Sequence, residues 1–206
     1  MHTRVRGFSL VEVLVALIVI CVGLLGVAKM QALALSNMTT SRLRALAAFE
    51  AAALAGAMHS NRNYWAVTPA TFAPNYSVTV TPSALAPAPV FASADGALVA
   101  AATADYPVNL NSCVGTNNGI AMCPNATNLA AYDLARWANS LKGLLPNSSA
   151  TISCPSVAGV TAPVSCTILI TWTERAVSMT AQAATQQAAN PNGAFETPSY
   201  LLYVEP

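Results

Sequence analysis

The sequence predicts an α+β protein in which one long amino-terminal helix packs, through its second half, on a small antiparallel β-sheet. Two observations predict this class. The first 68 of the 206 residues contain no proline, whereas all 13 prolines lie at or after Pro69. Beyond Pro69, short segments alternate between apolar and polar residues and are bounded by turn residues, which is typical of strands. The chain therefore changes architecture near Pro69.

The proline-free stretch from Phe8 to Asn63 predicts one uninterrupted helix, because a proline would remove a backbone amide and clash with the preceding turn. The stretch is rich in Leu, Ala, Val and Met, which are compatible with a helix. At about 1.5 Å per residue, such a helix is roughly 80 Å long. A compact domain of this size does not contain so long a helix, so we expect part of it to project.

The first half of this helix is apolar from Phe8 to Ala28, interrupted only by Ser9, Glu12 and two glycines. A run of this length spans roughly 31 Å, which is about the thickness of the hydrocarbon core of a bilayer. Residues 1–7 precede it and carry two arginines and no acid. The positive-inside rule predicts that this leader stays in the cytoplasm and that the rest is exported.

A small residue that could mark a cleavage site, Gly7, comes before the apolar run, whereas in a secretory signal it follows the run. Cleavage after Gly7 would therefore remove the leader and leave the membrane helix on the mature protein. It would also create a new ammonium group on Phe8.

Glu12 is the only charged side chain inside the apolar run. A carboxylate at the centre of a membrane helix costs about 2.5 to 3.5 kcal/mol, and less near the end of the helix, so Glu12 calls for a partner. Within one helix, the new amine of Phe8 is directed away from the Glu12 carboxylate of the same chain. The amine of a neighbouring subunit is the more natural partner, and such an ion pair would fix the axial stagger of adjacent helices.

Residues 7 to 12 read Gly-Phe-Ser-Leu-Val-Glu, and with the apolar residues that follow they resemble the prepilin leader and helix of type IV pilins and type II secretion pseudopilins. The resemblance implies a pilin-like fold, leader removal after Gly7 by prepilin peptidase, N-methylation of Phe8, and a role in assembly for Glu12. It also implies a single-pass protein of the bacterial inner membrane with a cytoplasmic amino terminus, later found in the pilus at the cell surface. The implied partners are other pilin subunits, the peptidase and methyltransferase, the inner-membrane assembly machinery and membrane lipid.

Two later segments, residues 133–146 and 167–174, resemble PilV-type minor pilins. With the size of the chain, they favour a minor pilin that supports pilus assembly within the pilus or its initiating tip complex. Two rivals stay open. A type II secretion pseudopilin has the same leader, and a membrane-anchored adhesin or binding module would use the stretch from Ser83 to Asn128, which we expect to be a surface loop.

The resulting domain plan has four parts: a leader at 1–7, a membrane and assembly half-helix at 8–35, an amphipathic half-helix at 36–65, and an extracytoplasmic domain at 66–206. The amphipathic half carries an apolar stripe, whereas Arg42, Arg44 and Glu50 lie largely off it. The expected stripe consists of Leu46, Phe49, Ala53 and Ala57.

Four segments of the extracytoplasmic domain predict strands, and one predicts a helix. Ile168, Ile170 and Trp172 should share one face of the longest strand. A short helix through Leu134 should end near Gly143 and Pro146. The segment 176–190 is compatible with a helix or a loop. The expected strands are 76–81, which we place at an edge of the sheet, 151–154, 166–173 and 200–204.

Five cysteines divide into one in the membrane run and four in the exported domain. Cys21 serves as a small apolar filler or as a lipidation site. The other four allow three connectivities, of which we expect the nearest-neighbour pairing, Cys113 with Cys123 and Cys154 with Cys166. Disulfides fit an oxidising compartment. Zinc binding is the rival use, but no C-x-x-C spacing and no nearby histidine supports it.

We expect neither an enzyme nor a bound cofactor or metal. After leader removal His59 is the only histidine, and the chain has no G-x-S-x-G, H-E-x-x-H or P-loop pattern. The net charge is +1 and no three basic residues are consecutive, which argues against direct binding of nucleic acid. The remaining acids that could act, none at paired spacing, are Asp95, Asp105, Asp133, Glu174 and Glu196. For Asp133 we expect the simpler role of an acid in the first turn of a helix, facing the helix dipole.

Overall fold

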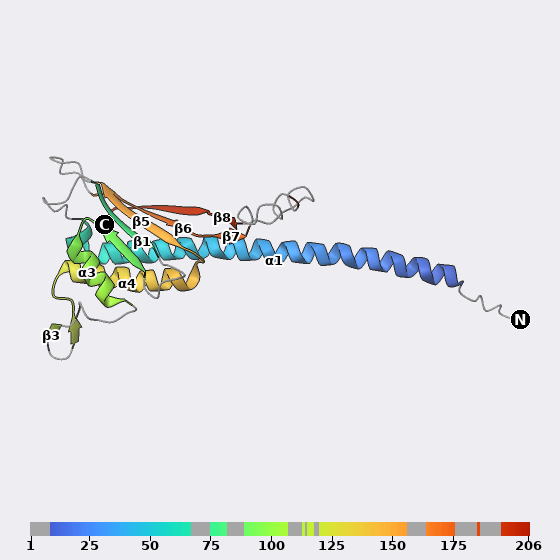
Figure 1. Ribbon diagram of the computed structural model, residues 1–206, viewed down its shortest axis with the longest axis horizontal. Helices are drawn as coiled ribbons and strands as arrows, with labels where there is room; N and C mark the ends of the chain where they lie inside the picture. Colours follow the sequence, from blue (N-terminus) through green and yellow to red (C-terminus); the bar gives the residue numbers. More distant parts are fainter. Residues whose placement is uncertain are drawn as a thin grey trace, which may run out of the picture. The chain divides into compact units, whose positions relative to one another are not determined.

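The computed structural model describes the chain at residues 9–66, 75–81, 89–106, 113, 115–117, 120–155, 164–175, 185 and 195–206. Its contacts divide the chain into two units, Met1–Ser41 and Arg42–Pro206. Helix α1, Leu10–Ser60, runs from the first unit into the second (Figure 1). The long apolar helix followed by an antiparallel sheet confirms the expected α+β, pilin-like class.

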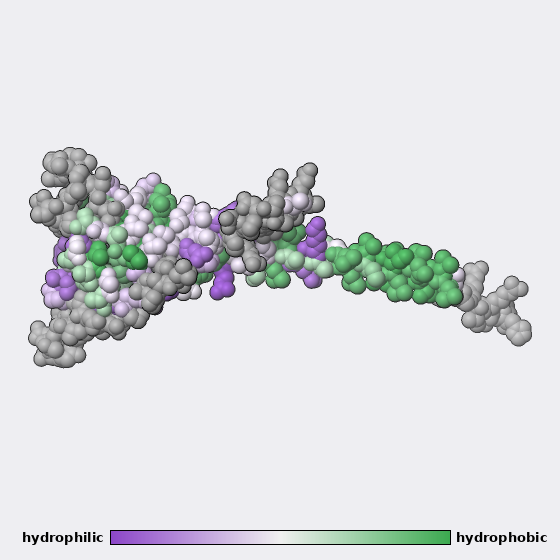
Figure 2. Space-filling view, in the orientation of Figure 1, coloured by the Kyte–Doolittle hydropathy of each residue, from purple (hydrophilic) through white to green (hydrophobic). Residues whose placement is uncertain are grey.

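The first unit consists, in its described part, of Ser9 and the portion of α1 from Leu10 to Ser41. None of its described side chains is buried, and Leu10 is 89% exposed. The visible surface of this part of α1 is hydrophobic over its first turns (Figure 2). α1 is long and apolar enough to cross a membrane, and no residue of its most apolar stretch is buried. This exposure fits membrane anchoring.

The second unit is built on a five-stranded antiparallel sheet with the order β2-β1-β5-β6-β9. All four expected strands are present. The expectation that the first of them lies at an edge is wrong, because β2 pairs with its outer side, with Val80 opposite Phe91. The strands are β1 Asn75–Thr81, β2 Val90–Ser93, β5 Ser149–Pro155, β6 Cys166–Thr171 and β9 Ser199–Val204.

The register of the sheet lines up one apolar row across four strands. Val78 lies opposite Ile152, Ile152 opposite Ile168, and Ile168 opposite Leu202. Because side chains alternate between the faces of a strand, the residues two positions along from Ile168 continue the same face. Ile170 and Trp172 are buried as expected, and they form the core with Ile168.

The helices of the second unit bury their own apolar faces in the same core. The expected stripe of α1 is wrong at two of its four positions: Phe49 is 67% exposed and Ala53 is exposed, whereas their neighbours Glu50 and Leu54 are buried. One residue corresponds to about 100° around a helix, so the centre of the covered face is rotated from the expected one. The other helices are α2 Arg62–Trp65, α3 Gly96–Asp105 and α4 Ala126–Leu144.

The stretch from Ser83 to Asn128, expected to be a surface loop, contains regular structure. It holds β2 and α3, and the first residues of α4. Asp95 starts α3, because its Oδ1 accepts hydrogen bonds from the backbone amides of Ala97 and Leu98 at 3.0 and 3.1 Å. Four short strands complete the described structure: β3 Gly115–Asn117, β4 Ile120–Met122, β7 Glu174–Arg175 and β8 Phe195–Glu196. Apart from Thr185, residues 176–190 lie outside the described part of the chain.

α4 ends where the sequence predicts, close to Pro146. The amide of Leu145 still donates to the carbonyl of Leu141, at 3.0 Å, and the chain then turns through Asn147. Asn147 has a φ of 47°, a left-handed conformation that asparagine tolerates better than most residues. The turn returns the chain from α4 to β5, so that both elements contribute to one core.

Candidate functional site

The amino-terminal assembly segment begins at Ser9 in the described structure, so Gly7 and Phe8 lie outside it. The carbonyl of Ser9 accepts hydrogen bonds from the amides of Glu12 and Val13, at 3.0 and 3.3 Å. Glu12 therefore lies in the first turn of α1. A carboxylate is favourable there, because the amino-terminal end of a helix carries a partial positive charge.

The side chain of Glu12 is exposed and surrounded along the helix by exposed apolar residues, among them Leu10 and Val13. No hydrogen bond or ion pair joins its carboxylate to another described residue. In water such a group needs no partner, whereas in hydrocarbon an unpaired carboxylate is strongly unfavourable. The geometry suits Glu12 for pairing with a cation outside its own described chain.

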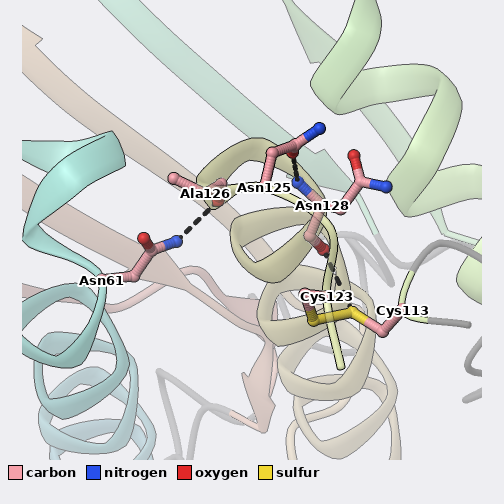
Figure 3. The surroundings of a disulfide bond; sticks show 6 residues. All are labelled: Asn61, Cys113, Cys123, Asn125, Ala126 and Asn128. Carbon is pink, nitrogen blue, oxygen red and sulfur yellow. Dashed lines mark hydrogen bonds between the residues drawn. A yellow bond between two sulfur atoms is a disulfide. The ribbon is translucent and has the colours of Figure 1, made fainter. Parts of the chain in front are cut away.

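Two disulfides crosslink the second unit, and they form the nearest-neighbour pairing expected from the sequence. Cys113 is bonded to Cys123, directly before the start of α4 (Figure 3). The first turn of α4 is fixed from two sides: the Asn125 side chain accepts from the amide of Asn128 at 2.8 Å, and the Asn61 side chain donates to the carbonyl of Ala126 at 2.7 Å. The end of α1, the disulfide and the start of α4 are thereby held together.

The second disulfide joins Cys154 of β5 to Cys166 of β6. Both cysteines are buried, and they lie on neighbouring strands of the five-stranded sheet. The bond closes a loop with a sequence separation of 12 residues at this end of the sheet. Cys21, the fifth cysteine, is free and exposed on the first unit.

The chain matches the family model described as the prokaryotic N-terminal methylation motif over residues 2–28. This match supports the type IV pilin superfamily. It spans Gly7, Phe8 and Glu12 and ends with the apolar run, so it covers the leader and the membrane half of the helix. No curated protein and no solved structure matches the chain.

The pilin-type leader implies processing by prepilin peptidase and contact with pilus assembly machinery. The motif and the exposed apolar helix together fit an anchored protein that reaches the pilus surface. The described residues contain no group of three or more His, Cys, Asp or Glu that could hold a metal ion. His59 is exposed in the last turn of α1.

Three of the acids considered above act as structural acceptors or lie in the core. Glu174 is buried and accepts from Trp172 Nε1 at 2.9 Å and from Arg44 Nη2 at 3.4 Å. Asp95 accepts from the Tyr64 hydroxyl at 2.8 Å in addition to capping α3. Asp105 is buried at the end of α3. The hydrogen bonds to these partners give Glu174 and Asp95 a structural role.

Sequence reasoning missed Glu50, which it placed off the apolar stripe. Glu50 is only 3% exposed, and its Oε1 accepts a hydrogen bond from the Ser140 hydroxyl at 2.6 Å. Its backbone carbonyl accepts from Trp137 Nε1 at 2.9 Å. The available signal was the small residues at 47, 51 and 55, which repeat every four positions and place residue 50 on the covered face.

Asp133 lies on α4 beside the same part of α1. Burial raises the pKa of its carboxyl to about 6, although the positive charge of Arg136 acts in the opposite direction. Sequence reasoning gave Asp133 only the role of a first-turn acid. The structure instead places it inside α4, in the second turn after Ala126.

Proposed function

We propose that the chain is a minor type IV pilin that supports pilus assembly. It is inserted through residues 8–35, cut after Gly7, methylated on Phe8, and built into the pilus or its initiating tip complex. The single observation that supports this most is the methylation motif at residues 2–28, followed by a helix whose apolar side chains are exposed. Before assembly it is a single-pass protein of the inner membrane with its amino terminus in the cytoplasm.

Glu12 would drive incorporation by pairing with the new amine on Phe8 of a neighbouring subunit. The exposed, unpaired carboxylate among apolar side chains supports this role. Leader removal would then switch the protein from a single membrane resident to a polymer subunit, because only the cut chain has the amine. An ion pair in lipid also sets the axial position, since either charge alone is costly there.

The protein would be a substrate of the peptidase and methyltransferase and not itself an enzyme. The partners that we propose are other pilin subunits, these processing enzymes, the inner-membrane assembly machinery and lipid, with no cofactor. The PilV-like segments support the minor class: residues 133–146 supply most of α4 and its end, and residues 167–174 supply most of β6.

Mass spectrometry of the mature amino terminus tests the proposal. In a host that carries prepilin peptidase, the recovered chain should begin at Phe8 and carry one added methyl group. In a matched host without the peptidase, the same protein should retain residues 1–7. Recovery of the chain with Met1 to Gly7 intact in the competent host would overturn the proposal.

A type II secretion pseudopilin is the second candidate, because the methylation motif supports it equally. The two differ only in partners, so the protein should co-purify with sheared pilus fibres under our proposal and with secretion components under the alternative. A membrane-anchored adhesin is the third candidate. Replacement of Glu12 by alanine should then leave binding intact.

A further inference from the structure

A cleft of about 270 Å³ lies between α1 and α4, entirely within the unit of residues 42–206. Phe49 and Glu50 of α1 and Asp133, Arg136 and Ser140 of α4 line it, with apolar side chains between them. Trp137 of α4 also lines the cleft, which therefore combines two aromatic side chains, two carboxyl groups and one guanidinium group. Neither the sequence patterns described above nor the methylation motif assigns the cleft a role.

The buried carboxylate of Glu50 is only partly satisfied. Ser140 donates to its Oε1, but no other described residue donates to the side chain and no described cation forms an ion pair with it. A buried carboxylate with one neutral donor is costly, because it has lost most of its hydration. A cation placed in the cleft would compensate for this loss.

The charges that line the cleft do not balance. Arg136 lies one turn after Asp133 on α4 and acts electrostatically on its carboxyl group. The guanidinium group of Arg136 belongs to an exposed side chain, so it is well hydrated where it is. With Arg136 assigned to Asp133, Glu50 is left as one net negative charge in the cleft.

The exposed aromatic ring of Phe49 favours the same kind of ligand. Phe49 is 67% exposed although it is one of the largest apolar side chains on the unit, so packing within the chain does not explain its position. The face of an aromatic ring attracts ammonium and guanidinium groups, and its surface also covers an alkyl stem. Phe49 and Glu50 are consecutive, and both line the cleft.

We propose that this cleft receives a lysine or arginine side chain from a neighbouring protein subunit, with the cation beside Glu50 and the alkyl stem against Phe49. The cation preference follows from the cleft alone. That the neighbour is another, non-identical pilin subunit in the fibre rests on the function proposed above. The two parts are therefore tested separately.

The cation preference is tested by titrating agmatine, a butyl stem with a guanidinium group at one end and an ammonium group at the other, into the full chain in detergent micelles. The indole N–H of Trp137, which bonds to the Glu50 carbonyl, reports binding by NMR. Agmatine should shift this signal at millimolar concentration, whereas pentanol, which is neutral, should not. Absence of a shift with agmatine, or an equal shift with pentanol, would overturn the proposal.

Matched variants separate binding from a purely structural role of Glu50. Glu50→Gln keeps the shape and the acceptor for Ser140 but removes the charge, and it should weaken agmatine binding roughly fivefold or more. Glu205→Gln removes one charge from an exposed position and should leave binding unchanged. Phe49→Ala changes an exposed residue, so the chain should fold, and binding should weaken roughly two- to fivefold. Unchanged binding in both Glu50→Gln and Phe49→Ala would refute the site.

The identity of the neighbour is tested with a photo-crosslinking phenylalanine at position 49 in assembled fibres. The crosslinked peptide should come from a different pilin subunit and contain a lysine or arginine close to the adduct. Adducts only to a second copy of this chain, or to peptides without a basic residue, would overturn this part. If the chain enters no fibre, the function proposed above fails, and the agmatine result still decides the cation preference.

Discussion

The two units of the chain use apolar side chains in opposite ways. In residues 9–41 no described side chain is buried, whereas in the second unit apolar side chains of the sheet and of α4 form a buried core. Leu, Val, Ile and Ala occur in both regions. Composition therefore does not distinguish the part that folds on itself from the part that needs lipid or neighbours to cover it.

The difference between the units lies in the length and continuity of the apolar pattern. In β6, buried side chains alternate with less buried ones, two of which are threonines, so one face of the strand is covered and the other is more open to solvent. From Leu10 to Ala28 the apolar residues continue around the whole helix, which leaves no polar face for solvent. The first pattern makes a core with other elements of the chain, and the second makes an anchor.

The largest expected difference in the free energy of unfolding comes from replacing one buried and one exposed apolar side chain by alanine. Ile168→Ala should lower the free energy of unfolding by about 2 to 5 kcal/mol, because it opens a cavity in the core. Leu17→Ala removes a similar volume from an exposed position and should change it by less than about 0.5 kcal/mol. Urea unfolding in micelles, followed by the fluorescence of the three tryptophans, which all lie in the second unit, measures both. Equal losses would contradict the contrast.

Removal of a disulfide comes next in size. The double variant Cys154→Ala, Cys166→Ala should lower the unfolding free energy by about 3 kcal/mol, because the unfolded chain regains the entropy of the open loop. Cys21→Ala is the control, since this cysteine is free and exposed on the first unit. The same urea titration applies, and a loss for Cys21→Ala as large as that of the double variant would be inconsistent with our account.

Asp95→Ala tests the part of the second unit that the sequence did not predict. It removes the cap of α3 and the acceptor for Tyr64, so we expect a loss of about 1 to 2 kcal/mol in the same assay. Asp95→Asn keeps an oxygen that can cap the helix and should cost less. If alanine and asparagine behave alike, capping does not stabilise this helix.

Asp133→Asn should have the smallest effect, and the size of this effect depends on pH. The carboxyl group has a pKa of about 6 in the folded chain and about 4 when unfolded, so the folded chain binds more protons between these values and stability falls as pH rises. Solvent screening limits the effect to about 1 kcal/mol. The variant should therefore be more stable than wild type at pH 7, with a flatter profile between pH 4 and 6. Urea titrations at pH 4, 5, 6 and 7 check this, with Glu205→Gln as control.

The sequence predicted the elements whose pattern repeats clearly and failed where the residues are too uniform. Alternation located β1, β5, β6 and β9, and it assigned Ile168 and Ile170 to one face. α3 was not predicted because five of its ten residues are alanine, which marks neither a polar nor an apolar face. The prediction that β1 lies at an edge of the sheet was wrong because its outer partner β2 was not predicted. β2 lies in the stretch from Ser83 to Asn128, which was expected to be a loop.

For the candidate functional residues, the sequence singles out Glu12 but not Glu50. Glu12 stands out in the sequence because it is a lone charge in an apolar run, and the structure places it exposed in the first turn of α1. Glu50 does not stand out, because an acid on an amphipathic helix normally faces solvent. Only the packing of α1 against α4 reveals that its carboxylate is buried and bonded to Ser140.

The most direct test of the account is the amount of Glu12→Ala protein in sheared surface fibres relative to the membrane fraction. We predict that the variant inserts in the membrane as well as wild type and is cut, but is lost from the fibres, because its helix has no carboxylate to pair with a neighbour's new amine. Glu12→Asp, which keeps the charge, should retain part of the incorporation. Glu12→Ala protein in the fibres at the wild-type level would contradict the account.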